Sequence, residues 1–301
     1  MKHPILFTAT AVLSLAAAAW SNERESIAAL EAAGAFVQRD ESQPDKPVVQ
    51  VTYNLRQVTD AGNNALKEIE DLPSIEFLGA GDTEISADTL RALQGKKSLR
   101  RFSIAYAKIS DESATILATL RSLEALDLRV QIEISPLGMD EILRMTNLRE
   151  LMLSDRLVND DILEALSRFS NLRTLTVRSI FVSDEGLRSL RRLKHLQTLR
   201  MFLSTEVTGQ GLRYLAELRL KDVEITYFNV TDSDLKELRK LHGLKTLRLM
   251  NAIKITDAAV PFLSEMTELT ELEIVGVKLS NEAIEKLNRA LPKCKIRQGT
   301  L

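Results

Sequence analysis

The chain has 301 residues, of which 45% are hydrophobic but only 5% are aromatic. Leu, Ile, Val and Ala therefore have to build the core, and this composition favours a stacked aliphatic array over a globular core centred on large rings. Forty Lys and Arg residues against 42 Asp and Glu residues give a formal charge of −2, so no net basic field would attract nucleic acid or an anionic membrane.

The N-terminus has the pattern of an export signal. A short basic start precedes the uncharged residues 4–19, which end in three alanines that fit a cleavage site. We predict that residues 1–19 are a signal peptide cleaved before Trp20, and that the mature chain is periplasmic or extracellular with no membrane span. The alternative is an uncleaved anchor at residues 4–21, because about 18 apolar residues are the lower limit for crossing a bilayer.

Residues 20–46 are predicted to form an N-terminal cap, since a repeat array needs a cover over its first core layer. Apolar residues such as Ile27 and Leu30 alternate with glutamates over residues 23–33, which predicts a helix, and Gly34 offers a stop. A polar turn then leads to a first strand at residues 48–52.

Residues 47–301 show an internal repeat. The phrase Leu-x-x-Leu-x-Leu occurs at residues 148–153 and recurs one period later at 172–177. From Phe102 to Leu272 its central apolar residue returns every 24 or 25 residues, which is a strong repeat signal. About ten repeats and a short C-terminal cap are expected. The predicted central residues are Val49, Ile75, Phe102, Leu126, Leu151, Leu175, Leu199, Val223, Leu247, Leu272 and Cys294.

A second phrase follows each strand, as in Val182-Ser183-Asp184. The hydroxyl of Ser183 can cap a helix by accepting from a free backbone N–H, and the carboxylate of Asp184 is favourable at the positive end of the helix dipole. Leu187 and Leu190 then recur at helical spacing. Each repeat is therefore predicted to run strand, turn, helix, turn.

These phrases resemble the leucine-rich repeat family, in the helical-backed subclass shared by ribonuclease inhibitor and the repeat domains of F-box proteins. The resemblance covers residues 47–296, and residues 182–187 look like a phrase of exported bacterial leucine-rich repeat proteins. It implies an α/β solenoid shaped as a right-handed horseshoe. Such a fold has a parallel sheet on the concave face, helices on the convex face, and binding on the concave side.

Few residues suggest catalysis. His195 and His242 lie in turns without ligand partners at metal-binding spacing. Residues 95–98 lack the earlier glycine of a phosphate loop, because Leu90 stands in its place. The glycines within residues 79–81 favour a turn insertion. We expect no catalytic, cofactor-binding or metal-binding residue, and no enzyme activity.

Cys294 is the only cysteine, so no disulfide can form within one chain. Its position in the repeat predicts a small buried hydrophobic residue, and the alternative is a reactive or pairing thiol.

Side chains between the buried strand residues should form columns on the concave face. Opposite charges alternate at the end of the middle column, which fits either a register-fixing ladder or a striped docking surface. The predicted middle column is Gln50, Glu76, Ser103, Asp127, Met152, Thr176, Arg200, Glu224, Arg248, Glu273 and Lys295. The column after it is Leu78, Ala105, Arg129, Ser154, Arg178, Phe202, Thr226, Met250 and Val275.

Aromatic, Met and Arg side chains are enriched at interface centres. We therefore predict a monomeric scaffold that binds a protein or peptide through its concave face. The alternatives are an architectural component of the cell envelope and a polysaccharide-binding module, although the latter favours rows of exposed Trp and Tyr. The predicted partner-binding residues are Arg178, Arg200, Phe202, Arg248 and Met250.

Overall fold

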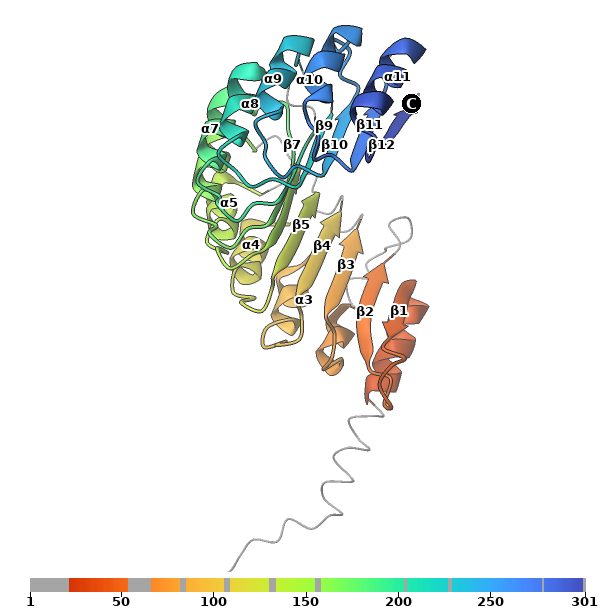
Figure 1. Ribbon diagram of the computed structural model, residues 1–301. Coiled ribbons are helices and arrows are strands. Elements are labelled where there is room, and N and C mark those ends of the chain that lie inside the picture. The colour runs from red at the N-terminus through yellow and green to blue at the C-terminus, as the bar shows by residue number, and fades with distance from the viewer. Residues whose placement is uncertain are drawn as a thin grey trace, which may run out of the picture. The chain divides into compact units, whose positions relative to one another are not determined.

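The computed structural model describes residues 22–53, 66–81, 85–105, 109–129, 134–154, 158–202, 205–226, 229–277 and 279–299 (Figure 1). The chain divides into two compact units, the first made of Met1–Leu123 and Val130–Ile142 and the second of Glu124–Arg129 and Leu143–Leu301. The predicted signal peptide, residues 1–19, and the alternative anchor, residues 4–21, both lie outside the described residues, which begin at position 22. Within the described ranges, no helix has the length and apolar character needed to cross a membrane.

The first unit begins with the expected helix and continues with a strand that we did not predict. β1 pairs antiparallel with β2, whereas β2, β3 and β4 run parallel. The elements are a helix at residues 22–32, β1 (Ala35–Arg39), β2 (Val48–Tyr53), η1 (Leu66–Asp71), β3 (Phe77–Gly81), α3 (Ala87–Ala92), β4 (Arg101–Ala105), α4 (Asp111–Leu117) and α5 (Pro136–Ile142).

The second unit is a parallel sheet, β5 to β12 in chain order, whose strands alternate with helical segments. Its strands are β5 (Ala125–Arg129), β6 (Glu150–Ser154), β7 (Thr174–Arg178), β8 (Thr198–Phe202), β9 (Asp222–Thr226), β10 (Thr246–Met250), β11 (Glu271–Val275) and β12 (Lys295–Gly299). Its helices are α6 (Asp160–Leu166), α7 (Asp184–Leu190), α8 (Gly209–Leu215), η2 (Asp232–Asp234), α9 (Leu235–Leu238), η3 (Asp257–Ala259), α10 (Val260–Ser264) and α11 (Asn281–Ala290).

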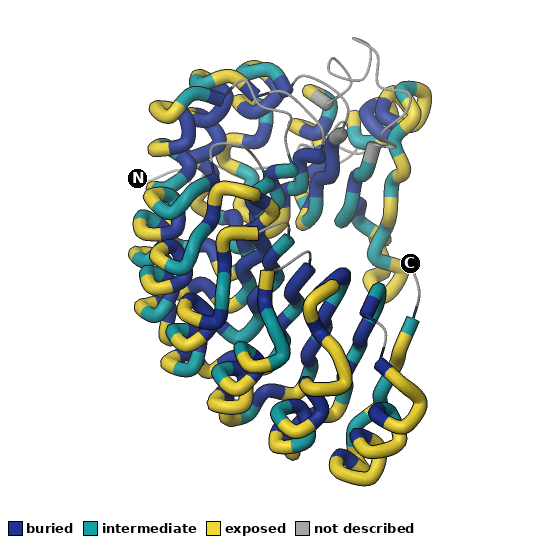
Figure 2. The backbone as a smooth tube through the Cα atoms, turned by 90° about the horizontal axis from the view of Figure 1, so that it is seen from above, coloured by how far each residue is buried: buried dark blue, intermediate teal, exposed yellow. Residues whose placement is uncertain are grey.

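The core of each unit lies between the strands and the helices, where the buried parts of the chain gather (Figure 2). In β7, Leu175 and Val177 point toward the helices and are fully buried, as are Leu187 and Leu190 of α7. Side chains between these strand residues point to the opposite side of the sheet. We call that side, which the helices leave uncovered, the helix-free face.

The predicted register is confirmed within the second unit. Pairing aligns Leu151 with Leu175, Leu175 with Leu199, and so on to Leu272. This follows from the regular phrase, in which both apolar strand positions are large aliphatic residues.

The predicted register is wrong near the N-terminus. Leu78 pairs with Phe102, and Val51 pairs with Leu78, so Val49 and Ile75 are not the central residues. The phrase here reads Ile75-x-x-Leu78-x-Ala80, and its last apolar position is only an alanine. Because Ile75 is bulkier than Ala80, the hydrophobic pattern favours Ile75 as the central residue, although Ile75 fills the first position of the phrase.

Two further corrections follow from this register. Gly79 and Gly81 lie within β3 and not in a turn insertion. At the C-terminus Ile296, not Cys294, pairs with Leu272, because the regular step of 24 residues continues to the last strand. The true middle column of the helix-free face therefore contains Thr52, Gly79 and Arg297 in place of Gln50, Glu76 and Lys295, and the column after it contains Gly81 in place of the buried Leu78.

Adjacent repeats are joined at the helix starts by a contact that we call the carboxylate clamp. In each clamp an Asp accepts a hydrogen bond from the backbone N–H and another from the side-chain hydroxyl of the next repeat's N-cap residue. The N–H to oxygen distances are 2.7–2.8 Å and the hydroxyl to oxygen distances are 2.5–2.7 Å. The pairs are Asp111 with Ser135, Asp160 with Ser183, Asp184 with Thr208, Asp232 with Thr256, and Asp257 with Ser280.

The clamp explains which residue stands three positions after each clamped N-cap. A Cβ on Gly186 would lie 2.4 Å from Oδ1 of Asp160, so a long side chain and the carboxylate compete for one space. The clamped repeats have only Gly or Ala there, namely Gly138, Gly186, Gly211, Ala259 and Ala283. Where the preceding repeat offers Ala87, Pro136 or Gly209 instead of Asp, the residue is Ser113, Ile162 or Asp234.

The clamps should make stability depend on pH. Hydrogen bonds from the Ser135 hydroxyl and backbone N–H lower the pKa of Asp111 below its ordinary 3.8, and those from Ser280 do the same to the pKa of Asp257. A lowered folded-state pKa gives stability that is present above the unfolded pKa and is lost as pH falls through the folded value. Asp257→Asn should therefore lower the melting temperature at pH 7, and the difference from wild type should shrink below about pH 4. A difference that stays constant with pH would contradict this reading.

Candidate functional site

The five predicted partner-binding residues lie on the helix-free face of β7, β8 and β10 in the second unit. Arg200 and Arg248 flank Glu224 in the middle column. The other three, Arg178, Phe202 and Met250, belong to the next column, at the carboxyl ends of their strands.

Arg248 is the centre of a charge network. Its guanidinium lies 2.9 Å from Oδ1 of Asp222, 3.4 Å from Oε2 of Glu271 and 3.3 Å from Oε2 of Glu273. Three carboxylates thus surround a single cation, Glu273 in its own column and Asp222 and Glu271 in the preceding one. Arg248 is already matched within the free chain and has little charge left to offer a partner.

The network continues to both sides of Arg248. Arg200 lies 3.2 Å from Asp222 and 3.6 Å from Glu224, and Arg297 lies 2.5 Å from Glu271. Asp222 therefore bridges Arg200 and Arg248. These contacts support the ladder interpretation for this column, because partly exposed pairs fix geometry while adding little stability.

Glu224 is the most enclosed carboxylate of the network. Burial raises its pKa above the ordinary 4.5, while Arg200 and Arg248 act in the opposite direction. The two arginines thus favour the charged form of Glu224 against the cost of its burial. Removing Arg200 would leave a half-buried carboxylate with fewer compensating charges.

The next column differs at β7 to β10, although Arg129 of the same column pairs with Asp127 at 2.9 Å. Arg178 is exposed and forms no ion pair with any other described residue. Phe202 and Met250 are partly exposed, and Thr226 between them is buried. The Thr226 hydroxyl is buried and has no hydrogen-bond partner among the described residues.

Three exposed apolar residues near this column were missed by the sequence analysis. Ile180 and Phe181, in the turn after β7, are 52% and 49% exposed, and Ile253, in the turn after β10, is 81% exposed. The Ser179 backbone N–H donates to the carbonyl of Phe202, so the Ile180 turn starts against that residue. The sequence signal was an Ile-Phe pair directly before the helix-capping phrase, where polar turn residues are usual. We call Ile180, Phe181, Phe202, Met250 and Ile253 the apolar rim.

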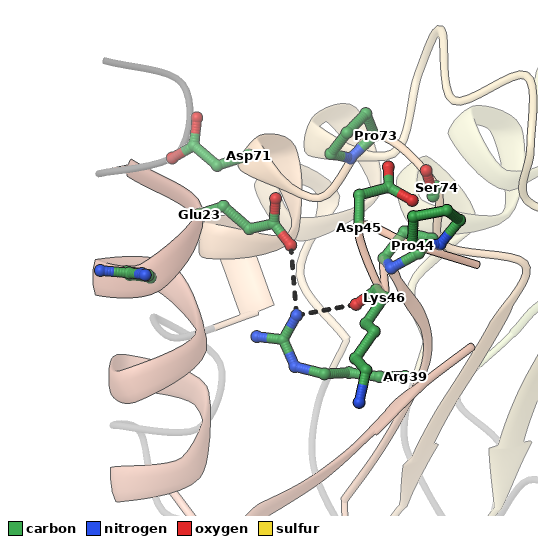
Figure 3. A pocket seen from close by; sticks show the side chains of 10 residues that line it. Glu23, Arg39, Pro44, Asp45, Lys46, Asp71, Pro73 and Ser74 are labelled. Atoms are coloured by element: carbon green, nitrogen blue, oxygen red, sulfur yellow. Dashed lines mark hydrogen bonds and ion pairs between the residues drawn. The ribbon is translucent and has the colours of Figure 1, made fainter. Parts of the chain in front are cut away.

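The first unit contains a cavity of about 460 Å³ at its N-terminal end (Figure 3). Arg39 crosses it, donating to the carbonyl of Lys46 at 2.9 Å and lying 3.9 Å from Glu23. Two of the charged lining residues, Arg39 and Glu23, thus bind one another. In the described ranges no three His, Cys, Asp or Glu side chains come together in a way that would hold a metal ion.

The remaining chemically interesting residues are dispersed. His195 and His242 are exposed in separate turns. Cys294 precedes β12 rather than filling the buried column, and burial raises its pKa, which disfavours the reactive thiolate.

Comparison with known proteins gives structural likeness only. No family model matches the chain, and no curated protein matches it. The internalin inlF from Listeria monocytogenes has a TM-score of 0.57 at 19% identity over 82% of this chain and 72% of its own. The internalin inlC2 from the same species has a TM-score of 0.50 at 22% identity, over 71% and 84%. Rad7, in its complex with Elc1 from yeast, gives 0.62 at 19% identity, over 82% and 68%.

Proposed function

Because this chain has the leucine-rich-repeat fold, we propose that it is a non-enzymatic scaffold that binds a protein or peptide. The binding surface is the helix-free face of the second unit, at the carboxyl ends of β7 to β10. The observation that carries this proposal is the apolar rim beside the unpaired cation Arg178.

The composition of the rim suits the centre of an interface. Exposed Phe, Ile and Met side chains gain free energy when a partner removes them from water, at about 25 cal/mol per Å² of apolar area. An unpaired arginine can form bidentate hydrogen bonds with a partner carboxylate. Arg178 combines these features with two rings, because it pairs with Phe202 across β7 and β8 and precedes Phe181 in the turn after β7.

The charge network has a different part in this proposal. Arg200 and Arg248 are held by Asp222 and its neighbours in the free chain, so they keep the middle of the face in a fixed arrangement. We therefore assign more of the binding free energy to Phe202 and Arg178 than to the charge network. Arg200 and Arg248 lie at the border of the proposed binding surface.

The structural neighbours are compatible with this function. Rad7 was solved together with Elc1. No described aromatic row favours a polysaccharide ligand, since Tyr214 lies on α8 and holds the guanidinium of Arg213 over its ring at 4.8 Å. Export to the periplasm or the exterior, a monomeric state and an architectural envelope role stay predictions.

Phe202→Ala should weaken partner binding by at least about 1–2 kcal/mol, or roughly 5- to 30-fold, while changing the melting temperature little. The reason is that a partly exposed ring contributes more to an interface than to the core. The partner would be captured from the envelope fraction with residues 20–301 as bait, then purified and titrated by calorimetry. The matched control is Lys236→Gln, an exposed change on α9.

Equal affinity for wild type, Phe202→Ala and Arg178→Ala would exclude the helix-free face as the binding surface. Failure to capture any partner would favour the architectural role.

A further inference from the structure

The turns that lead into β6, β7, β8, β9 and β10 carry a concentration of positive charge that the overall charge of −2 conceals. Together they contain twelve Lys and Arg residues and one acidic residue, Glu217. We call this side of the second unit the basic edge. Its cations are Arg144, Arg149, Arg168, Arg173, Arg191, Arg192, Lys194, Arg219, Lys221, Arg239, Lys240 and Lys245.

The opposite side, where the strands end and the helices start, carries the compensating charge. Lys254 is its only basic residue in the ranges 158–161, 180–185, 205–210, 229–234 and 253–258. Helix dipoles favour this separation, because they attract anions at helix starts and cations at helix ends. Its acidic residues are Asp160, Asp161, Asp184, Glu185, Glu206, Asp232, Asp234 and Asp257.

Backbone hydrogen bonds set the spacing of the basic edge. The N–H of Arg173 donates to the carbonyl of Arg149 at 2.7 Å, and the N–H of Gln197 donates to that of Arg173 at 2.8 Å. Lys221 and Lys245 continue the series at 2.7 and 2.8 Å. Four of these five successive positions are cationic, and the strand spacing puts them about 4.8 Å apart per step.

Part of this charge is neutralised within the chain. Six of the cations have acidic partners, namely Arg149, Arg191, Lys194, Arg239, Lys240 and Lys245. By contrast, five exposed cations form no ion pair with another described residue. They are Arg168, Arg173, Arg192, Arg219 and Lys221.

The basic edge is also hollowed. A cavity of about 390 Å³ opens between two successive turns, and Arg219, Lys221, Lys240 and His242 line it. Its one acidic lining residue, Glu217, lies 3.8 Å from Lys194. The cavity is therefore a place where a carboxylate from outside the chain would meet two unpaired cations.

The surroundings of these cations indicate the class of ligand. No large apolar side chain is exposed among the described residues of the five turns, so nothing there would insert into a bilayer. These turns expose no Phe, Tyr or Trp ring, and their two exposed imidazoles, His195 and His242, lie in separate turns, so no row of rings is present to stack on successive bases or sugars. We propose that the basic edge binds an acidic, extended segment of a protein. This second surface does not depend on the helix-free face.

The test uses a fluorescein-labelled oligo-glutamate of about twelve residues, with binding to the purified chain followed by fluorescence anisotropy at about 0.1 M salt. Arg219→Gln/Lys221→Gln should weaken binding about fivefold or more, because both cations line the cavity. Lys236→Gln/Lys254→Gln removes the same formal charge from exposed positions outside the basic edge, and should change the affinity less than about twofold. Circular dichroism melting confirms that both variants fold.

Equal weakening by the two double variants would mean that only net charge matters, and would overturn the proposal. So would tighter binding of heparin, single-stranded DNA or phosphatidylserine vesicles than of oligo-glutamate, or no binding of oligo-glutamate at all. Phe202→Ala should leave oligo-glutamate binding unchanged, so the two surfaces can fail separately. A loss of oligo-glutamate binding in Phe202→Ala would place the acidic ligand on the helix-free face and overturn the proposal as well.

Discussion

Leu175→Ala is expected to lower the free energy of unfolding by about 2–5 kcal/mol. Leu175 is fully buried in β7 and pairs with Leu151 on one side and Leu199 on the other. Its removal would open a cavity between consecutive strands, and the neighbouring repeats can close it only in part because the backbone ladder fixes their spacing. Urea denaturation followed by circular dichroism measures the change.

Thr174→Ala is the matched control for Leu175→Ala. Thr174 is the preceding residue of the same strand, but it is only partly buried and points to the helix-free face. It should change the free energy of unfolding by less than about 1 kcal/mol. Similar unfolding curves for the two variants would contradict the assignment of Leu175 to the buried side of β7.

Gly186→Val should cost about 2–4 kcal/mol, the second largest effect that we expect. A Cβ at this position would lie 2.4 Å from Oδ1 of Asp160 and 2.9 Å from Cδ1 of Leu163. The valine methyls would therefore displace the carboxylate that accepts two hydrogen bonds from Ser183. Thermal and urea unfolding would both report the loss.

Gly186→Ala separates the clamp from helix propensity. Alanine occupies the equivalent position in two clamped repeats, at Ala259 and Ala283. It should therefore cost far less than valine, although alanine and valine both improve the helix propensity over glycine. If Gly186→Val were as stable as Gly186→Ala, the carboxylate would have room to move and the competition for space would be disproved.

The sequence was sufficient to predict the register of β5 to β11. There both strand positions are large apolar residues and the period stays at 24 or 25 residues, so only one register buries every leucine. Near the N-terminus that condition fails. Gly79 and Ala80 replace large residues in β3, so the hydrophobic pattern alone allowed a second alignment.

β1 was not predicted because its pattern is weak. In Ala35–Arg39 no residue is fully buried, since a terminal strand has a neighbour on one side only. Its alternation therefore lacks the contrast between apolar and polar residues that identifies an inner strand.

The candidate site was predicted only in part, because only its strand residues follow the repeat period. Strand periodicity placed Arg178, Phe202 and Met250 in one column, and pairing agrees with that placement. Turn residues follow no such period, so Ile180 and Ile253 gave no comparable signal. The strand pattern could not predict that Asp222 pairs with both Arg200 and Arg248, because these contacts join neighbouring columns and depend on side-chain geometry.

The carboxylate clamp also bears on how such an array can gain or lose a repeat. A repeat whose helix starts with Asp has to be followed by a repeat whose N-cap residue carries a hydroxyl. Most junctions between repeats therefore cannot be recombined freely. The junction before Thr231 is different, because the N-cap takes its carboxylate from Asp234 of its own repeat, at 2.9 Å from its N–H. The carboxylate occupies the space beside Gly209, where a Cβ would lie 2.1 Å away. An additional repeat could be spliced in at this junction without leaving a helix cap unpaired, provided that it too presents a glycine there.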